Sequence, residues 1–262
     1  MRLSADQENR YRTEGFLVLE ELFSPAEVET LRAGYEADAS IAAPHRFLEP
    51  DSGHVATLFA LHDRLPEFDA LARSPRLLEP ARQLVADQLY LYQMKVNTKS
   101  ACGGKTQGWH QDYIAWRLAD QLPAPRMVTM GILLDDSTEF NGPLIFIPGS
   151  HTAGLLRDDR AEGSEPDAFV DSNDVALTPE ILAELVEHRG MRSIQAPAGS
   201  AVIFHPEVVH GSAPNMSPHP RRPLILTYND IHNLPRNPTP RPHYLVNRDT
   251  APLSAYQPAG RG

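Results

Sequence analysis

Along the first 88 residues, apolar positions recur at helical spacing, and the polar positions between them carry helix-start signals. Ser4 and Ser24 are each followed three residues later by Gln or Glu, which is the pattern of a capping box. The first of these signals predicts a helix over residues 5–14. Residues 43–65 show no periodicity and are expected to be irregular. We interpret residues 1–88 as a helical buttress for the rest of the chain.

From residue 89 onward the pattern becomes typical of β-strands. Runs rich in aliphatic and aromatic residues occupy 89–97, 126–134 and 201–204, and Gly, Pro and Asn separate them. Several short strands that follow flanking helices predict a mainly β fold, a double-stranded β-helix of the jelly-roll, cupin type. We expect this core to span residues 89–230.

Two segments depart from the strand pattern. Residues 152–191 form an acidic insertion that contains Gly and Pro, and long irregular insertions of this kind are more often lids than linkers. Within it, Val170 is suited either to contact an aliphatic substrate or to join a small satellite core. Residues 231–262 contain six prolines and no periodic pattern, so we expect them to wrap the barrel. The chain as a whole, residues 1–262, is expected to be a single domain.

Composition narrows the classes of partner. The chain has 34 Asp and Glu against 24 Lys and Arg, a formal charge of −10. Nucleic acid and anionic membrane surfaces are poor partners for such a chain, which favours a small-molecule substrate. With no run of eighteen apolar residues and no signal-peptide pattern, the protein is expected to be cytoplasmic. One cysteine, Cys102, excludes an internal disulfide.

Candidate chemistry begins with a His-X-Asp pair at His110 and Asp112. In an extended segment, residues i and i+2 point to the same side, so the two side chains can converge on a metal ion. A single His-X-Asp pair without a further ligand is more often a hydrogen-bonded pair in a loop than a metal site. A second histidine completes the facial triad of non-heme iron(II) oxygenases. His210 is the preferred partner, and His205 is the competing one.

An arginine opens the apolar run that follows His210. Arg221 precedes residues 222–228, which read as a buried strand. An arginine entering a core strand is unfavourable unless it is paired. Its planar guanidinium can hold a carboxylate through two parallel hydrogen bonds. Arg221 therefore indicates a bound carboxylate near the metal candidate.

Four motifs together give the chain a family resemblance. They are the N-terminal pattern from Tyr11 to Leu19, the Trp109–Asp112 motif, residues 141–151 and the stretch from His210 to Arg221. In these motifs, which span most of its length, the chain resembles the phytanoyl-CoA dioxygenase-like branch of the iron(II)- and 2-oxoglutarate-dependent oxygenases. The resemblance implies a hydroxylase that uses Fe(II), 2-oxoglutarate and O2 and releases succinate and carbon dioxide.

The same resemblance assigns roles to individual residues. The metal ligands would be His110, Asp112 and His210. The residues expected to bind 2-oxoglutarate are Arg221 at its distal carboxylate, with Asn97, Ser212 and Thr129 as further hydrogen-bonding partners. The presence of Asp112 favours hydroxylation, because related halogenases carry a small residue at this position.

The substrate is the last expectation. Trp116 and the Pro240-Arg241-Pro242 element resemble ectoine hydroxylases and free-amino-acid hydroxylases. They imply a free aliphatic L-amino acid, leucine or a close analogue, with Arg241 on its carboxylate and Trp116 and Val170 as an apolar wall. Three alternatives stay open: an acyl-CoA or carrier-bound substrate, a non-enzymatic cupin metal-binding module, and a surface ion pair as the only role of Arg241.

Overall fold

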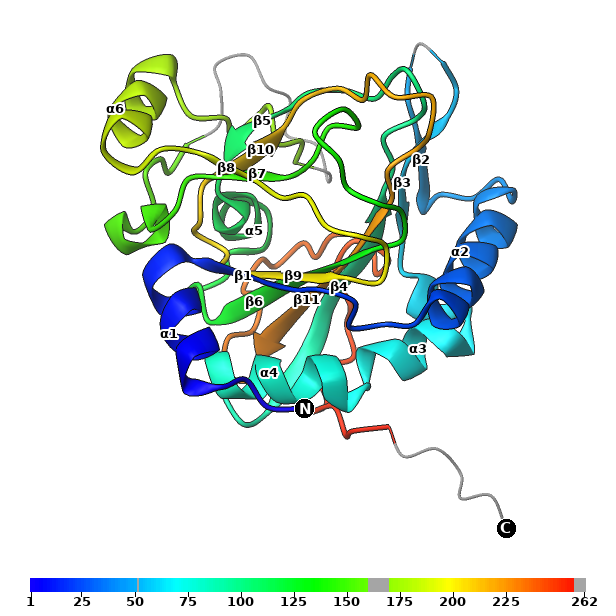
Figure 1. The fold of residues 1–262 in the computed structure, drawn as a ribbon. Helices are drawn as coiled ribbons and strands as arrows, with labels where there is room; N and C mark the ends of the chain where they lie inside the picture. Colours follow the sequence, from blue (N-terminus) through cyan, green and yellow to red (C-terminus); the bar gives the residue numbers. More distant parts are fainter. Residues whose placement is uncertain (51, 160–169, 257–262) are drawn as a thin grey trace.

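The computed structural model describes residues 1–50, 52–159 and 170–256, which form two antiparallel sheets and the helices around them (Figure 1). The larger sheet has seven strands, in the order β1 (Phe16–Leu19), β9 (Ala201–Phe204), β6 (Met127–Leu133), β11 (Pro223–Asp230), β4 (Leu89–Asn97), β3 (Val55–Phe59) and β2 (Arg46–Leu48). The smaller sheet has the order β5 (Gln107–His110), β10 (His210–Ser212), β7 (Ile145–Phe146) and β8 (Arg192–Ser193). Two facing antiparallel sheets are the predicted jelly-roll core.

Four helices cover the outer face of the larger sheet: α1 (Ala5–Glu14), α2 (Pro25–Ala39), α3 (Pro66–Ala72) and α4 (Pro75–Leu84). Their apolar faces share one hydrophobic core with outward-pointing residues of the strands, such as Met94 and Val96 of β4. The predicted starts are confirmed, because Ser4 and Ser24 both form capping boxes. Gly15 ends α1 with φ +83°, a conformation that favours glycine.

The expectation of an irregular segment over residues 43–65 is wrong. This segment contains β2, β3 and the 3-10 turn η1 (Leu61–Asp63). β3 pairs with β4, and Thr57 lies opposite Asn97 in that ladder. The short strands form because β4 offers a free edge some forty residues further along the chain, and periodicity within the segment cannot reveal such a pairing. Residues 1–88 therefore contribute both helices and strands of the larger sheet.

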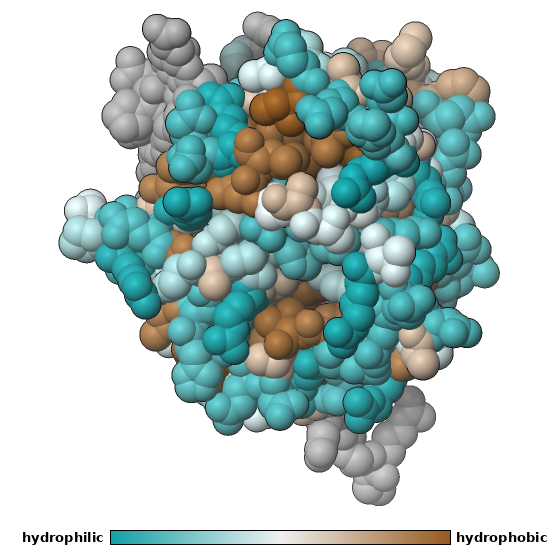
Figure 2. All heavy atoms as spheres, turned by 90° about the vertical axis from the view of Figure 1, so that its left-hand side faces the viewer, coloured by the Kyte–Doolittle hydropathy of each residue, from teal (hydrophilic) through white to brown (hydrophobic). Residues whose placement is uncertain are grey.

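The remaining elements lie around the smaller sheet. Helix α5 (Asp112–Asp120) follows β5 directly, and η2 (Ser150–Ala153) and α6 (Pro179–Arg189) belong to the predicted lid. Residues 160–169 of that lid, and residues 257–262 of the predicted wrap, lie outside the described residues. The α6 side chains are at most partly buried, and Figure 2 shows an apolar area on the side of the molecule where this helix lies.

The described part of the C-terminal segment lies along β4. The backbone N–H groups of Asn247 and Leu253 donate to carbonyls of Tyr92 and Leu89, and the side chain of Gln93 donates to the carbonyl of Leu245. Among the described residues, no helix is both long and apolar enough to cross a membrane.

Candidate active site

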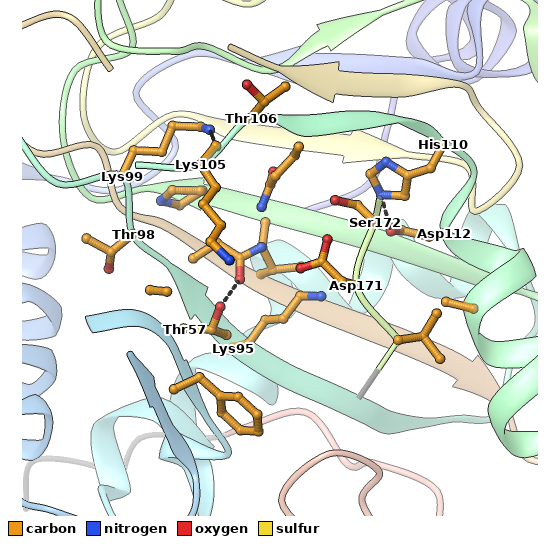
Figure 3. A pocket seen from close by; sticks show the side chains of 18 of the residues that line it. Thr57, Lys95, Thr98, Lys99, Lys105, Thr106, His110, Asp112, Asp171 and Ser172 are labelled. Atoms are coloured by element: carbon orange, nitrogen blue, oxygen red, sulfur yellow. Dashed lines mark hydrogen bonds and ion pairs between the residues drawn. The ribbon is translucent and has the colours of Figure 1, made fainter. Parts of the chain in front are cut away.

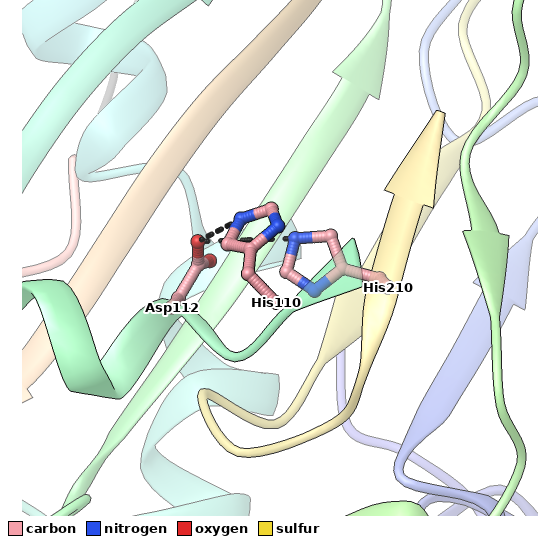
Figure 4. A group of neighbouring side chains, drawn as sticks. All are labelled: His110, Asp112 and His210. Atoms are coloured by element: carbon pink, nitrogen blue, oxygen red, sulfur yellow. Dashed lines mark ion pairs between the residues drawn. The ribbon is translucent and has the colours of Figure 1, made fainter. Parts of the chain in front are cut away.

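Two histidines and one aspartate meet at the end of the smaller sheet (Figure 4). The antiparallel ladder of β5 and β10 places His210 directly opposite His110, so residues one hundred positions apart share one face. Asp112 is the first residue of α5. Its Oδ1 lies 3.4 Å from Nε2 of His110 and 3.8 Å from Nε2 of His210. The three potential ligand atoms all lie within 4.8 Å of one another.

Hydrogen bonds fix which nitrogen each imidazole presents. Nδ1 of His110 lies 2.7 Å from the carbonyl oxygen of Gly108, and Nδ1 of His210 lies 3.1 Å from that of Val208. A carbonyl can only accept, so both Nδ1 atoms carry a hydrogen and both Nε2 atoms keep their lone pairs. Both lone pairs therefore face Asp112, and this outer hydrogen bonding is typical of metal-binding histidines.

Electrostatics favour the ligand forms of these groups. Burial, followed by the neighbouring His110, lowers the pKa of His210 to about 4, so this imidazole is neutral at pH 7. Burial opposes ionisation of Asp112, but His210 and His110 outweigh it and hold the pKa of this carboxyl below its usual range. The neutral imidazole of His210 and the carboxylate of Asp112, together with Nε2 of His110, suit a divalent metal such as iron(II).

The competing assignment of His205 is wrong. Its ring lies against His151 and Tyr11, at centroid distances of 5.1 and 6.4 Å, and its Nδ1 accepts from the backbone N–H of Glu207. The geometry predicted for Asp112 also needs a correction. The chain is extended at His110, the last residue of β5, and at Gln111, with φ −111° and ψ 130°. Asp112 already begins a helix, so the two ligands do not share one extended segment.

A pocket of about 310 Å³ is lined by both the metal candidate and Arg221. Figure 3 shows part of its wall, including His110 and Asp112. Arg221 is 2% exposed, and its Nε and Nη1 have no hydrogen-bond partner among the described residues. Burial lowers the pKa of this guanidinium to about 10, so it stays charged. A buried, unpaired guanidinium at a pocket wall fits a carboxylate ligand. Its neighbour Arg222 is instead paired with Asp135 and Glu36.

The three further residues predicted to bind 2-oxoglutarate differ in their access to the pocket. Asn97 lines it, and the Thr57 hydroxyl donates to its Oδ1 over 3.2 Å, which leaves the amide NH2 for a ligand. Ser212 is buried behind the wall and donates to Gln107, which itself lines the pocket. Thr129 is fully buried against Thr227 and is not part of the wall.

All three predicted substrate residues line the same pocket. Trp116 packs edge-on against Tyr92 at 5.5 Å, and Val170 lies in a small apolar cluster with other residues of α5 and the lid. Arg241 is 8% exposed, and its Nε and Nη2 donate to Asp120, which is 2% exposed. The expectation that an ion pair of Arg241 would lie at the surface is wrong, because this pair is buried.

The sequence analysis missed one feature of the wall. The chain has three lysines, and all three line the pocket: Lys95, Lys99 and Lys105 (Figure 3). Lys95 belongs to an alternation along β4, in which residues 93, 95 and 97 face the pocket while Met94 and Val96 face the outer core. This period of two is visible in the sequence and could have revealed a polar inner face.

A jelly roll with a His-Asp-His group suited to a metal ion, in one pocket with a buried arginine suited to a carboxylate, is typical of metal-dependent oxygenases that use a keto-acid cosubstrate. The chain belongs to the phytanoyl-CoA dioxygenase (PhyH) family, whose model matches residues 11–223. It is an iron(II)- and 2-oxoglutarate-dependent dioxygenase of the kind that hydroxylates amino-acid-type compounds.

Several relatives are similar over nearly the whole chain. L-proline trans-4-hydroxylase of Streptomyces griseoviridis is 38% identical, over 95% of this chain and 94% of its own. An ectoine dioxygenase of Bordetella bronchiseptica is 34% identical, over 94% and 83%. The crystal structure of EctD from S. alaskensis with 2-oxoglutarate and 5-hydroxyectoine has a TM-score of 0.82 and 29% identity, over 97% of this chain and 86% of that one.

Proposed function

We propose that the protein hydroxylates an unactivated C–H bond of a small free aliphatic L-amino acid, with leucine or a close analogue as the first candidate. The observation that carries the proposal is one pocket that joins three features. These are the His-Asp-His site, the Arg221 guanidinium, whose Nε and Nη1 have no partner among the described residues, and an apolar wall that includes Trp116 and Val170.

Each part of the pocket has a task in this reaction. His110, Asp112 and His210 would hold iron(II) on one face and leave its other positions open. Arg221 and Asn97 would bind 2-oxoglutarate, with Ser212 acting through Gln107. When bound, iron(II), 2-oxoglutarate and O2 supply the oxidation that places one oxygen atom in a C–H bond and releases succinate and carbon dioxide. The protein's own contribution is to fix which C–H bond lies nearest and to exclude water.

Size and surroundings favour a small substrate. A volume of about 310 Å³ is at the low end of the range for small-molecule sites, and cosubstrate and substrate must share it. Two of the relatives are named for small compounds, proline and ectoine. Arg241 is the predicted partner of the substrate carboxylate, and Trp116 and Val170 would contact the side chain.

The test is a turnover screen with iron(II), 2-oxoglutarate and O2. Free L-leucine, longer aliphatic analogues and L-proline are compared with ectoine and with acyl-coenzyme A thioesters, and succinate and hydroxylated product are both measured. We expect product from an aliphatic amino acid. Product from the thioesters alone would refute the proposal and establish the acyl-thioester alternative. The absence of product from every free amino acid tested would refute the proposal as well.

A further inference from the structure

Strand β4 presents a row of polar side chains to the pocket, and one of them is unlike its neighbours. Gln93 donates to the carbonyl of Leu245, and Asn97 accepts from Thr57. Lys95 lies between them, and within the described ranges its ammonium group makes no hydrogen bond and no ion pair. In Figure 3 its ammonium group points into the pocket, toward the side on which Asp171 lies. A flexible cation with three free donors in a pocket wall is suited to bind an anionic group of a ligand.

Lys99, the next lysine along the chain, differs from Lys95. Lys99 donates to the carbonyl of Lys105 and lies opposite Arg221 in an isolated β-bridge, so it belongs to the Arg221 end. The charged groups that act on Lys95 are Asp112, Arg241 and Asp171, and Arg221 is not among them. Lys95 therefore faces the metal candidate and the predicted substrate end.

Asp171 supplies the opposite charge across the pocket. It follows Val170 in the described part of the lid and also lines the pocket. Its Oδ1 accepts from the backbone and side-chain nitrogens of Asn173, at 2.9 and 2.8 Å, which hold the carboxylate in place. Its Oδ2 accepts no hydrogen bond from the residues that the structure describes. One oxygen is thus fixed and the other is available to a donor on a ligand.

Among Lys95 and the charged groups that act on it, one group of each sign is left without a partner in the described structure. Arg241 is balanced by Asp120, with which it forms a buried pair. Asp112 and the two histidines are the metal ligands. What remains is the positive Lys95 and the negative Asp171. A ligand with a separated positive and negative charge satisfies both, whereas a neutral or singly charged ligand leaves at least one of them unpaired.

We propose that Lys95 and Asp171 together bind the zwitterionic head of the substrate. The carboxylate lies on Lys95 beside Arg241, and the ammonium group donates to Asp171. This inference rests on the proposed function, because it assumes a free amino acid in this pocket. It adds the two residues that would select a free amino acid over an amide, an acid without an amine, or a thioester.

Binding to the anaerobic protein loaded with Fe(II) and 2-oxoglutarate tests the assignment without turnover. The calorimetric probes are L-leucine, L-leucinamide, which lacks the carboxylate, and 4-methylpentanoate, which lacks the amine. We expect Lys95→Met to reduce the preference for leucine over leucinamide at least about tenfold, since losing one partner of a desolvated charge pair has effects of this size or more. Asp171→Asn should reduce the preference for leucine over 4-methylpentanoate to a similar degree.

Two variants serve as controls. Lys95→Arg keeps the charge and should retain most of the preference for leucine, which separates loss of charge from loss of fold. Lys99→Met is the same substitution four residues further on, at the Arg221 end. It should weaken 2-oxoglutarate binding and leave the preference for leucine over leucinamide as in the wild type.

The outcomes separate the two proposals. If the wild type binds leucine and Lys95→Met keeps the full preference over leucinamide, the assignment of Lys95 is wrong while the proposed function stands. If Lys95→Met weakens 2-oxoglutarate binding instead, Lys95 belongs to the cosubstrate site. If the wild type binds neither leucine nor L-proline, the proposed function fails first. The pair L-proline and L-prolinamide repeats the test with a cyclic amino acid.

Discussion

Replacing Arg221 with leucine should separate cosubstrate binding from protein stability. The guanidinium is 2% exposed and has two nitrogen atoms without a partner among the described residues, so it is suited to bind an anionic ligand. Losing a charge-assisted pair in such a desolvated site removes about 2 to 5 kcal/mol of binding free energy. This corresponds to an affinity for 2-oxoglutarate that is weaker by roughly 30-fold to several thousandfold.

Without 2-oxoglutarate, the stability of the Arg221→Leu variant should not fall. Arg221→Leu removes a buried charge that has no counter-charge within hydrogen-bonding distance in the described structure, so the free energy of unfolding is expected to be unchanged or raised. Saturation with 2-oxoglutarate at one hundred times its Kd stabilises a protein by about 2.7 kcal/mol, and the variant should lose this gain. Urea unfolding of anaerobic Fe(II)-loaded protein, with and without 2-oxoglutarate, measures both quantities.

Arg222, the next residue and the one directly before β11, provides the matched control. Its guanidinium makes two hydrogen bonds of 2.8 and 2.7 Å to Asp135 and one of 2.8 Å to Glu36. Arg222→Leu leaves the largely buried Asp135 without this partner and should lower the free energy of unfolding by about 1 to 3 kcal/mol. Its effect on 2-oxoglutarate binding should be small. A larger cosubstrate defect in Arg222→Leu than in Arg221→Leu would refute the reasoning.

Three further predictions concern the metal, the substrate and pH. His210→Ala should abolish turnover and weaken iron(II) binding by more than the roughly 10- to 100-fold of losing an outer-shell partner, while circular dichroism stays as in the wild type. Val170→Ala should shift the amino-acid preference toward bulkier side chains by about tenfold in kcat/KM; an unchanged preference would remove Val170 from the substrate wall. Burial, with His151 as the second cause, lowers the pKa of His205 to about 4, so the metal-free protein should lose stability as the pH falls from about 6.5 toward 4, because the unfolded chain binds the proton first. His205→Gln should flatten this dependence in urea unfolding.

Local signals in the sequence predicted those parts of the molecule that form through local interactions. The capping boxes at Ser4 and Ser24 are contacts between residues three apart, so each start can be read from a few letters. Arg221 could be predicted because a charge that opens an apolar run is rare without a partner. His210 could be predicted from the residues around it, the Gly211-Ser212 that follow it after an apolar run. These residues belong to β10, the strand that places His210 opposite His110.

Other parts depend on pairing between distant segments. β3 forms on the edge of β4, and Arg241 meets Asp120 across 121 positions of sequence. Nothing within either segment specifies its partner. The charge of Arg241 can therefore be read from the sequence, but its pairing with Asp120 cannot. Lys95 is a different case. The alternation along β4 indicates that it faces inward, but only the pocket shows that this lysine lacks the partners that its neighbours have.

The buried pair of Arg241 and Asp120 bears on how the substrate end should be tested. Arg241→Ala alone would leave Asp120, which is 2% exposed, with its charge uncompensated, although the Tyr92 hydroxyl still donates to it. Breaking a buried pair in this way costs about 3 to 5 kcal/mol of stability. Weak leucine binding in that variant would therefore reflect damage to the fold as much as loss of an anchor.

The double variant Asp120→Asn with Arg241→Gln removes both charges and keeps groups that can hydrogen-bond to each other. We expect it to regain most of the stability lost in Arg241→Ala, as measured by urea unfolding, because no unpaired charge is left in the core. If Arg241 contacts the substrate carboxylate, the stable double variant should still bind leucine at least about tenfold more weakly than the wild type. If instead it binds leucine with wild-type affinity, Arg241 only fastens the C-terminal segment to α5, and Lys95 is left as the cation that holds the carboxylate.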